Sequence, residues 1–261
     1  IREQAIDKLG FGYERVKELR PDIIYVHAVG FSKDGAYAGR QAYDDLVQAA
    51  SGTTAFQGLV DGDPTPRYVP ALLADTTTGL HAVYASLAAL FHRERTGEGQ
   101  FVEVPMLESF VSFSFAEHLY GHSFVPPTGQ MGYKRVMNPN RQPYKTEDGY
   151  ISIVPYDDRQ WEEFFRIGDR MEVYKDPRFA TYQARTENSE ALYGVIKEVA
   201  VTRTTDEWLE ALDAARVPAM RANDFETLME DPHLLSIDFF EQHDHPTEGR
   251  YVQMKAPINF E

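Results

Sequence analysis

An unbroken apolar segment near the start of the chain constrains its fold more than any other feature. Residues 22–31 read DIIYVHAVGF, rich in β-branched side chains and without alternating polar positions. Such a run predicts a strand buried on both faces, as in a parallel sheet covered by helices. It follows the amphipathic segment 13–21, a predicted helix that ends at Pro21. A helix leading into a buried strand predicts an α/β layer.

Changes in composition further along the chain predict its division into domains. A long helix and a second strand, FVEVPML, continue the α/β pattern to residue 120. Residues 121–144 hold Pro, Gly and Asn without any period, which is typical of a linker. A strand and amphipathic helices then predict a small α+β domain at 145–216. We therefore expect a large α/β domain at 1–120 and a return segment to it at 217–261.

Charge and composition exclude several classes of protein. The chain has 41 acidic and 26 basic residues and a net charge of −15, which disfavours a nucleic-acid partner. It has no cysteine, so it has no disulfide framework and no thiolate nucleophile, in keeping with a cytoplasmic location. No apolar run approaches the roughly 20 residues of a membrane span. Neither nucleic acid nor membrane is expected as a partner.

The start of the chain has no signal peptide and no initiating methionine. It begins with Ile1, inside a predicted helix that covers residues 2–9 and ends at Gly10. We therefore expect that the natural protein has further residues before this helix.

A single carboxylate in the segment LLADTTTGLHA is the first candidate for chemistry. Asp75 follows a Gly- and Pro-rich loop at 57–71 and precedes a predicted helix, so it is a plausible N-cap. The same position, close to exposed N–H groups and the positive end of the helix dipole, favours an ionised carboxylate. Such a carboxylate could attack an acyl carbonyl and form a mixed anhydride, with oxyanion donors among residues 76–79. Spacing alone leaves both interpretations open.

Apolar residues recur at helical spacing after Asp75 and predict one apolar face. They are Leu80, Val83, Tyr84, Leu87, Leu90 and Phe91.

The segment GRQAYDDLVQAASG, residues 39–52, holds further candidates. Arg40 could bind a phosphate or could be a solvated loop residue. Tyr43 and Asp44 stand at a predicted helix start, where capping alone would explain Asp44. His243 and His245 lie in a predicted turn, QHDHPTEG, where neighbouring side chains seldom reach one ion. No metal site is therefore predicted.

Several of these segments, taken in order, carry a family resemblance. RPDIIYVHAVGF, AYDDLVQAASG and LLADTTTGLHAVYASLAALFHRERTGEGQFVEVPMLES resemble the family III CoA-transferases, also called the CaiB/BaiF family. PYKTEDGYISI and VPAMRANDFETLMEDPHL are similar to the start of that family's small domain and to its return segment. The most specific part is the T-G-x-G-Q turn at 96–100 after the D-x-x-x-G helix start at 75–79.

The resemblance implies a fold and an activity. The fold would be a Rossmann-like α/β large domain, whose N-terminal part is missing from this chain, with a small α+β domain, in an interlocked homodimer. The activity would move CoA from an acyl-CoA thioester to a small carboxylic acid through an anhydride on Asp75. By motif match, Lys8 would approach the phosphates of coenzyme A, while Gln41, Tyr43 and Asp44 would line the CoA and acyl site. Coenzyme A would enter as substrate, without a metal.

Two other activities stay open beside the transferase. Racemases of the same family resemble this chain at Asp75 but carry a histidine where Tyr43 stands. Tyrosine, with a pKa of about 10, is a poor acid or base for exchanging an α-proton, which favours the transferase. Tyr43 could also simply pack at a helix start, and a non-catalytic CoA-binding protein is the third alternative. For the family's glycine-rich loop, residues 128–132 and Gln142 are candidates.

Overall fold

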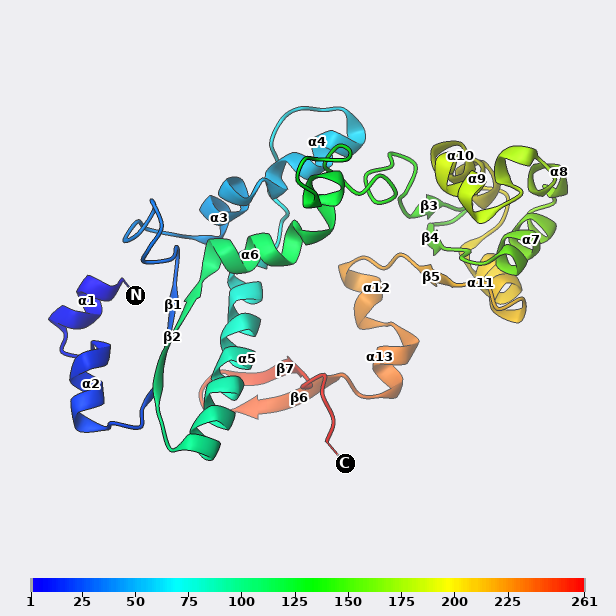
Figure 1. Ribbon diagram of the computed structural model, residues 1–261. Helices are drawn as coiled ribbons and strands as arrows, with labels where there is room; N and C mark the ends of the chain where they lie inside the picture. Colours follow the sequence, from blue (N-terminus) through cyan, green and yellow to red (C-terminus); the bar gives the residue numbers. More distant parts are fainter. Residues whose placement is uncertain (1, 261) are drawn as a thin grey trace. The chain divides into compact units, whose positions relative to one another are not determined.

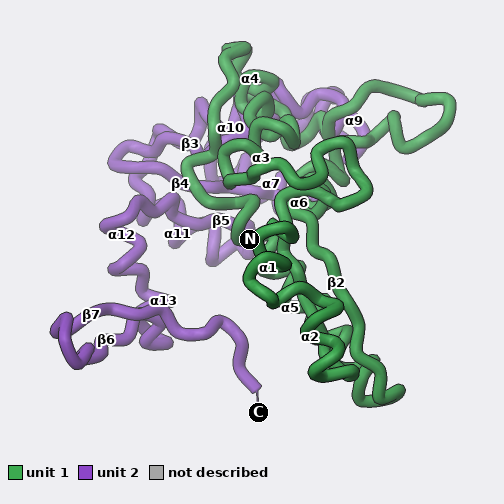
Figure 2. Tube along the Cα trace, turned by 90° about the vertical axis from the view of Figure 1, so that its left-hand side faces the viewer, with its two compact units in different colours: residues 1–139 green, residues 140–261 purple. Residues whose placement is uncertain are grey.

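The computed structural model describes residues 2–260 and contains two compact units. Unit 1 comprises residues 1–139 and unit 2 residues 140–261 (Figure 2). The boundary falls inside segment 121–144, where the sequence predicts a linker. Whether residues 217–261 return to the large domain concerns the placement of one unit against the other and stays a prediction.

Unit 1 combines helices with one parallel pair of strands (Figure 1). Its elements are α1 (Glu3–Lys8), α2 (Tyr13–Leu19), β1 (Ile24–Val29), α3 (Asp44–Ser51), η1 (Thr53–Ala55), α4 (Phe56–Asp61), α5 (Leu73–Thr96), β2 (Gln100–Pro105), α6 (Met106–Ser114), η2 (Ala116–His118) and η3 (Tyr120–Ser123). Helix α4 lies in the segment expected to be a loop.

Strands β1 and β2 pair in parallel, from Ile24 opposite Gln100 to Val29 opposite Pro105. The connection between them contains α3, η1, α4 and α5, and α5 packs against both strands, as in a βαβ crossover. In this structure β1 is only partly buried: His27 is buried, and the other residues of the strand are half-buried or exposed. Helix α5 packs against the two strands, and the ring of Tyr13 from α2 contacts Tyr25 and Phe101. The expected full burial on both faces is therefore not found in the described residues.

Two glycines shape the turn from α5 into β2. Gly97 ends the helix in the left-handed region, at a φ of +76°, which favours a residue without a side chain. A Cβ on Gly99 would stand 2.2 Å from the carbonyl oxygen of Ile23, so the chain can pass there only as glycine. The T-G-x-G-Q segment is thus a helix stop followed by a strand start, as predicted.

Helix α5 has a buried side and an apolar side that is largely exposed. Ala74, Thr77, Thr78 and Ala89 are buried. The predicted apolar face exists, but within the described residues it is not covered. Five of its side chains are 57–63% exposed: Leu80, Val83, Tyr84, Leu87 and Phe91. The buried apolar cluster of unit 1 that involves α5 is correspondingly small: Val47, Ala74, Met106 and Phe110.

Unit 2 contains an antiparallel sheet, several helices and a separate hairpin. Its elements are β3 (Tyr144–Lys145), β4 (Tyr150–Ile153), α7 (Asp158–Ile167), α8 (Met171–Tyr174), η4 (Pro177–Phe179), α9 (Tyr182–Glu187), α10 (Ser189–Ala200), α11 (Thr205–Ala214), β5 (Ala219–Arg221), α12 (Phe225–Met229), α13 (Pro232–Ser236), β6 (Phe240–His245) and β7 (Gly249–Met254). The sheet order is β3-β4-β5, so this sheet includes a strand beyond residue 216, where the small domain was expected to end.

The core of unit 2 is rich in buried aromatic side chains. Trp161, Phe164, Phe165 and Trp208 form part of one buried cluster with aliphatic residues from α10 and α11. The ring of Phe164 stacks on Trp208, with centroids 6.0 Å apart. The indole N–H of Trp208 donates to the carbonyl of Ala200 at 2.8 Å, which satisfies its polar atom inside the core.

The chain's last strands form an exposed ribbon. Strands β6 and β7 pair antiparallel, from Phe240 opposite Met254 to His245 opposite Gly249. The prediction that His243 and His245 lie in a turn is wrong, because both belong to β6 and the turn follows them. Apolar and polar residues do not alternate regularly in FEQHDH, so the strand had no clear signal in the sequence.

Candidate active site

A cavity of about 840 Å³ lies in unit 1, at the carboxyl ends of its two parallel strands. Its walls come from the start of α1, the end of β1, the loop before α3 and the first turns of α5. From β2 and α6 it receives Glu103 and Met106. In α/β folds this edge of the sheet is where ligands bind, because helix N-termini and loops converge there.

Asp75 lines this cavity and its side chain is exposed, but it is not a helix cap. Helix α5 begins at Leu73, so Asp75 is its third residue, and the flanking Leu72 provides no side-chain cap. The predicted N-cap is therefore wrong. The helix starts earlier than the sequence suggests because another residue binds its first N–H groups.

That residue is Asp44, the first residue of α3. Its Oδ1 accepts hydrogen bonds from the backbone N–H of Ala74 at 2.7 Å and of Asp75 at 3.1 Å. The Asp44 side chain is 5% exposed and is not among the residues that line the cavity. Asp44 was expected to cap its own helix, and this is wrong. It caps α5, whose first residues lie about 30 positions further along the chain.

The hydroxyl groups near Asp75 are used inside the helix. Thr76 donates its hydroxyl to the carbonyl of Leu72 at 2.8 Å, and Thr78 donates to Ala74 at 2.6 Å. In this arrangement neither hydroxyl points its hydrogen at a developing oxyanion. Of the residues suggested as oxyanion donors, Thr78 and Gly79 line the cavity.

The other predicted site residues divide between the cavity and its surroundings. Gln41 and Tyr43 line the cavity together with Asp75, and Tyr43 is 67% exposed at the start of α3. Lys8 lies in the last turn of α1 and is not among the lining residues. The candidate Arg40 lines the cavity, and its guanidinium lies over the ring of Tyr37, 4.5 Å from the centroid.

Sequence reasoning missed other polar residues of the cavity. Arg2 and Lys33 add positive charge to its wall, and Glu103 adds negative charge. His27 is buried within an otherwise apolar strand and contacts the ring of Phe101 edge-on. The position of Lys33 just after the predicted strand was the one available signal, because residues at that edge of a parallel sheet meet at a common site.

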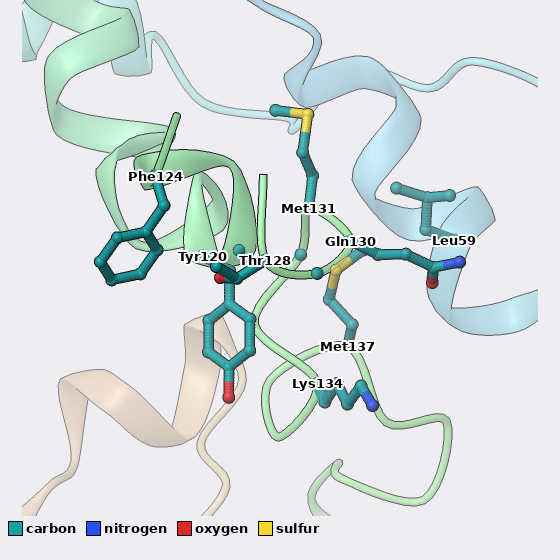
Figure 3. A pocket seen from close by; sticks show the side chains of 11 residues that line it. Leu59, Tyr120, Phe124, Thr128, Gln130, Met131, Lys134 and Met137 are labelled. Atoms are coloured by element: carbon teal, nitrogen blue, oxygen red, sulfur yellow. The ribbon is translucent and has the colours of Figure 1, made fainter. Parts of the chain in front are cut away.

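A second cavity of about 600 Å³ lies among the loops of unit 1. Figure 3 shows Tyr120 and Phe124 on one side of it and Leu59 on the other. All of the candidate glycine-rich loop, residues 128–132, lines this second cavity, which shares no lining residue with the cavity at Asp75. The other loop candidate, Gln142, belongs to unit 2. The position of the glycine-rich loop stays a prediction.

Two negative findings apply to residues 2–260. No three or more histidine, aspartate or glutamate side chains gather there in a way that could hold a metal ion. No helix in that range combines the length and apolar character needed to cross a bilayer.

Comparison with known families identifies the chain. The sequence profile of CoA-transferase family III matches residues 1–261, so the chain belongs to this family. It is 29% identical over 248 residues to succinyl-CoA:glutarate CoA-transferase from Homo sapiens, covering 94% of this chain and 56% of that protein. It is 28% identical over 276 residues to formyl-CoA:oxalate CoA-transferase from Streptomyces coelicolor, covering 97% of this chain and 65% of that protein.

Solved structures agree with this assignment. A CAIB/BAIF family protein from Brucella suis matches with a TM-score of 0.77 and 28% identity, covering 100% of this chain and 67% of that one. Rv3272 from M. tuberculosis shares the fold, with a TM-score of 0.83 and 24% identity over 100% of this chain and 69% of that one. The expected mixed α/β fold of this family is confirmed. The chain spans between 56% and 65% of the two curated relatives named above.

Proposed function

We propose that this protein transfers CoA between an acyl-CoA thioester and a carboxylic acid, with Asp75 as the nucleophile. The observation that carries the proposal is the exposed carboxylate of Asp75 in the cavity at the carboxyl ends of β1 and β2. It stands in the first turn of a 24-residue helix, where the helix dipole favours negative charge. Membership of CoA-transferase family III supports the same chemistry.

The reaction consists of four acyl substitutions. The Asp75 carboxylate attacks the thioester carbonyl, the C–S bond breaks, and CoA leaves as a thiolate from a mixed anhydride. The thiolate then attacks the Asp75 carbonyl, releasing the donor acid and leaving Asp75 as a CoA thioester. The acceptor carboxylate attacks that thioester, its C–S bond breaks, and CoA leaves as a thiolate from a second anhydride. CoA finally attacks the acceptor's carbonyl, which frees the product and restores Asp75.

Three positive groups in the cavity suit the proposed substrates. Arg2, Lys33 and Arg40 line it together with the carboxylates of Glu3, Asp75 and Glu103, and they would bind the phosphates of CoA or an acceptor carboxylate. Gln41 and Tyr43 would contact the acyl part, while Lys8 would reach CoA phosphates outside the cavity wall. Small dicarboxylic acids are the proposed acceptors, because the relatives' names specify glutarate and oxalate.

Trapping tests the proposal directly. The full-length protein is incubated with succinyl-CoA or formyl-CoA and hydroxylamine, which cleaves acyl-aspartate intermediates to a hydroxamate. We expect the hydroxamate at Asp75, found by peptide mass spectrometry, and a loss of turnover on the order of a thousandfold or more in Asp75→Asn. Asp45→Asn is a matched change of an exposed aspartate outside the cavity. It should leave the hydroxamate at Asp75 and the turnover unchanged. Full activity in Asp75→Asn would disprove the mechanism.

Two further measurements separate the alternatives. A racemase would exchange the α-proton of a 2-methylacyl-CoA with deuterated water, and we expect no such exchange because Tyr43 replaces a histidine. A non-catalytic protein would bind CoA but give no product with glutarate or oxalate as acceptor. Light scattering at several concentrations tests the interlocked homodimer that the family resemblance implies.

A further inference from the structure

The first turn of α5 is held by a side chain from a different helix. Asp44 lies 30 residues before Ala74, and one of its carboxylate oxygens accepts from both Ala74 and Asp75 N–H. No side chain at the N-cap position of α5 performs this role, since Leu72 is apolar. The group that binds the backbone N–H of Asp75 is therefore the carboxylate of Asp44.

A buried glutamine completes the arrangement. The Nε2 of Gln48 donates to the other oxygen of Asp44 at 2.6 Å and to the carbonyl of Ala71 at 3.0 Å. Its Oε1 accepts from the N–H of Val69 at 2.9 Å. Gln48 is 1% exposed, so these bonds form away from competing water. Asp44 and Gln48 together hold the chain from Val69 to Asp75 against α3.

Both oxygens of Asp44 are thus engaged by protein groups, and the side chain is buried outside the cavity lining. Asp44 therefore does not reach a substrate in the cavity. Its influence on the cavity must pass through the residues it binds or adjoins. Two of those residues line the cavity. One is Asp75, whose N–H binds Asp44, and the other is Tyr43, which precedes Asp44 in the sequence.

We propose that Asp44 is a positioning residue, whose carboxylate fixes the first turn of α5 and thereby the direction from which Asp75 attacks. This inference rests on the proposed function of Asp75. Without an acceptor at position 44, the N–H of Ala74, which is buried, would lose its partner, and the first turn would shift or fray. A displacement of about 1 Å in a reacting group can slow a reaction about a hundredfold.

Three variants of the full-length protein test the inference. Asp44→Ala removes the acceptor. Asp44→Asn keeps an amide oxygen that can still cap α5, but its NH2 group replaces Oδ2 and meets the Nε2 donor of Gln48. Asp45→Ala changes the exposed neighbouring aspartate as a control. Each is assayed for the rate of hydroxamate formation at Asp75 with succinyl-CoA and hydroxylamine, and for KM. Hydrogen exchange of the peptide covering residues 72–78 reports the state of the first turn without depending on turnover.

We expect Asp44→Ala to form the hydroxamate about 10 to 100 times more slowly, with KM within about twofold of wild type. Exchange in residues 72–78 should be faster. Asp44→Asn should recover only part of the rate and of the protection, because its NH2 group faces the Nε2 donor of Gln48, and Asp45→Ala should match wild type. A residue that only stabilised the fold would lower the amount of active protein without changing the rate per active site.

Two results would overturn the inference. The first is a wild-type rate in Asp44→Ala with unchanged exchange at 72–78, which would show that Asp44 holds neither the turn nor Asp75. The second is faster exchange at 72–78 with an unchanged rate, which would show a cap without a positioning role. Failure of the proposed function is distinct: wild-type protein would give no hydroxamate at Asp75, while exchange would still show whether Asp44 caps the helix.

Discussion

Units 1 and 2 begin their helices in different ways. In unit 2, helices α7, α11 and α12 start with capping boxes in which Asp157, Thr204 and Asp224 bond to residues three positions later. In unit 1, none of the described helices α1 to α6 has a side-chain cap at its N-cap position. The start of α5 depends instead on Asp44, from elsewhere in the chain.

The two units also differ in burial. The core of unit 2 encloses both tryptophans and three phenylalanines, whereas the α5 cluster of unit 1 has four buried members and α5 exposes an apolar face. The cavity with Asp75 belongs to the less buried unit. In unit 2, three helix starts are therefore stabilised by residues close in sequence. In unit 1, the helix that carries Asp75 is stabilised at its start by a residue distant in sequence.

The largest effect is expected in the core of unit 2. Phe164→Ala should lower the free energy of unfolding of this unit by about 3 to 5 kcal/mol, because it empties a fully buried site beside Trp208. Guanidinium unfolding followed by tryptophan fluorescence measures this, since both tryptophans lie in unit 2. Phe225→Ala, at a side chain 90% exposed, is the matched control and should change it by less than about 0.5 kcal/mol. If Phe164→Ala and Phe225→Ala lowered the free energy of unfolding equally, the buried aromatic core would not be what stabilises unit 2.

A smaller effect is expected on helix α5, where two neighbouring positions can be compared. Ala89→Gln forces a larger side chain into a buried site and should cost about 1 to 3 kcal/mol. Leu87→Gln, on the exposed apolar face, should cost less than about 0.5 kcal/mol. Hydrogen exchange of α5 peptides measures both. A concentration-dependent loss of protection in Leu87→Gln would show instead that another surface covers this face.

The smallest effect concerns acid stability in unit 2. Hydrogen bonds, first from the backbone N–H of Thr205 and then from its hydroxyl, lower the pKa of Asp148 below its usual 3.8. A lowered pKa means that the ionised carboxylate stabilises the fold above about pH 4, and that this contribution is lost as pH falls through the folded pKa. Urea unfolding of wild type and Asp148→Asn should therefore differ near neutral pH and converge in acid. A difference that persists unchanged to about pH 3 would contradict this assignment.

Sequence alone predicted what local chemistry determines. The glycine turn after α5 depends on residues within a few positions of each other. The sequence left open whether Asp75 is a helix cap or a reactive carboxylate. The cap is wrong, because the start of α5 is held by Asp44, 30 positions before Ala74. The reactive role stays a prediction. Helix α4 was missed because Gly58 and Gly62 suggested a loop, although Gly62 only ends the helix in the left-handed region.

The same limit applies to the cavity. Its lining comes from segments that are apart in sequence and meet only through the parallel pairing of β1 and β2. Gln41 and Tyr43 were predicted through the family resemblance, whereas His27 lay hidden inside an apolar run. The hydrophobic periodicity of a sequence does not show that the side chain of a buried strand residue lines a cavity.

The turn at 96–100 has a consequence for how such proteins are recognised from sequence. Its two glycines are required by backbone geometry: one ends a helix and the other passes against Ile23. Neither glycine lines the cavity. A chain could therefore keep this most recognisable signature, fold in the same way and lack any reactive group at position 75. Searching genomes for the turn alone would therefore select an architecture. Under the proposed function, a carboxylate at position 75 would also be required to select an enzyme.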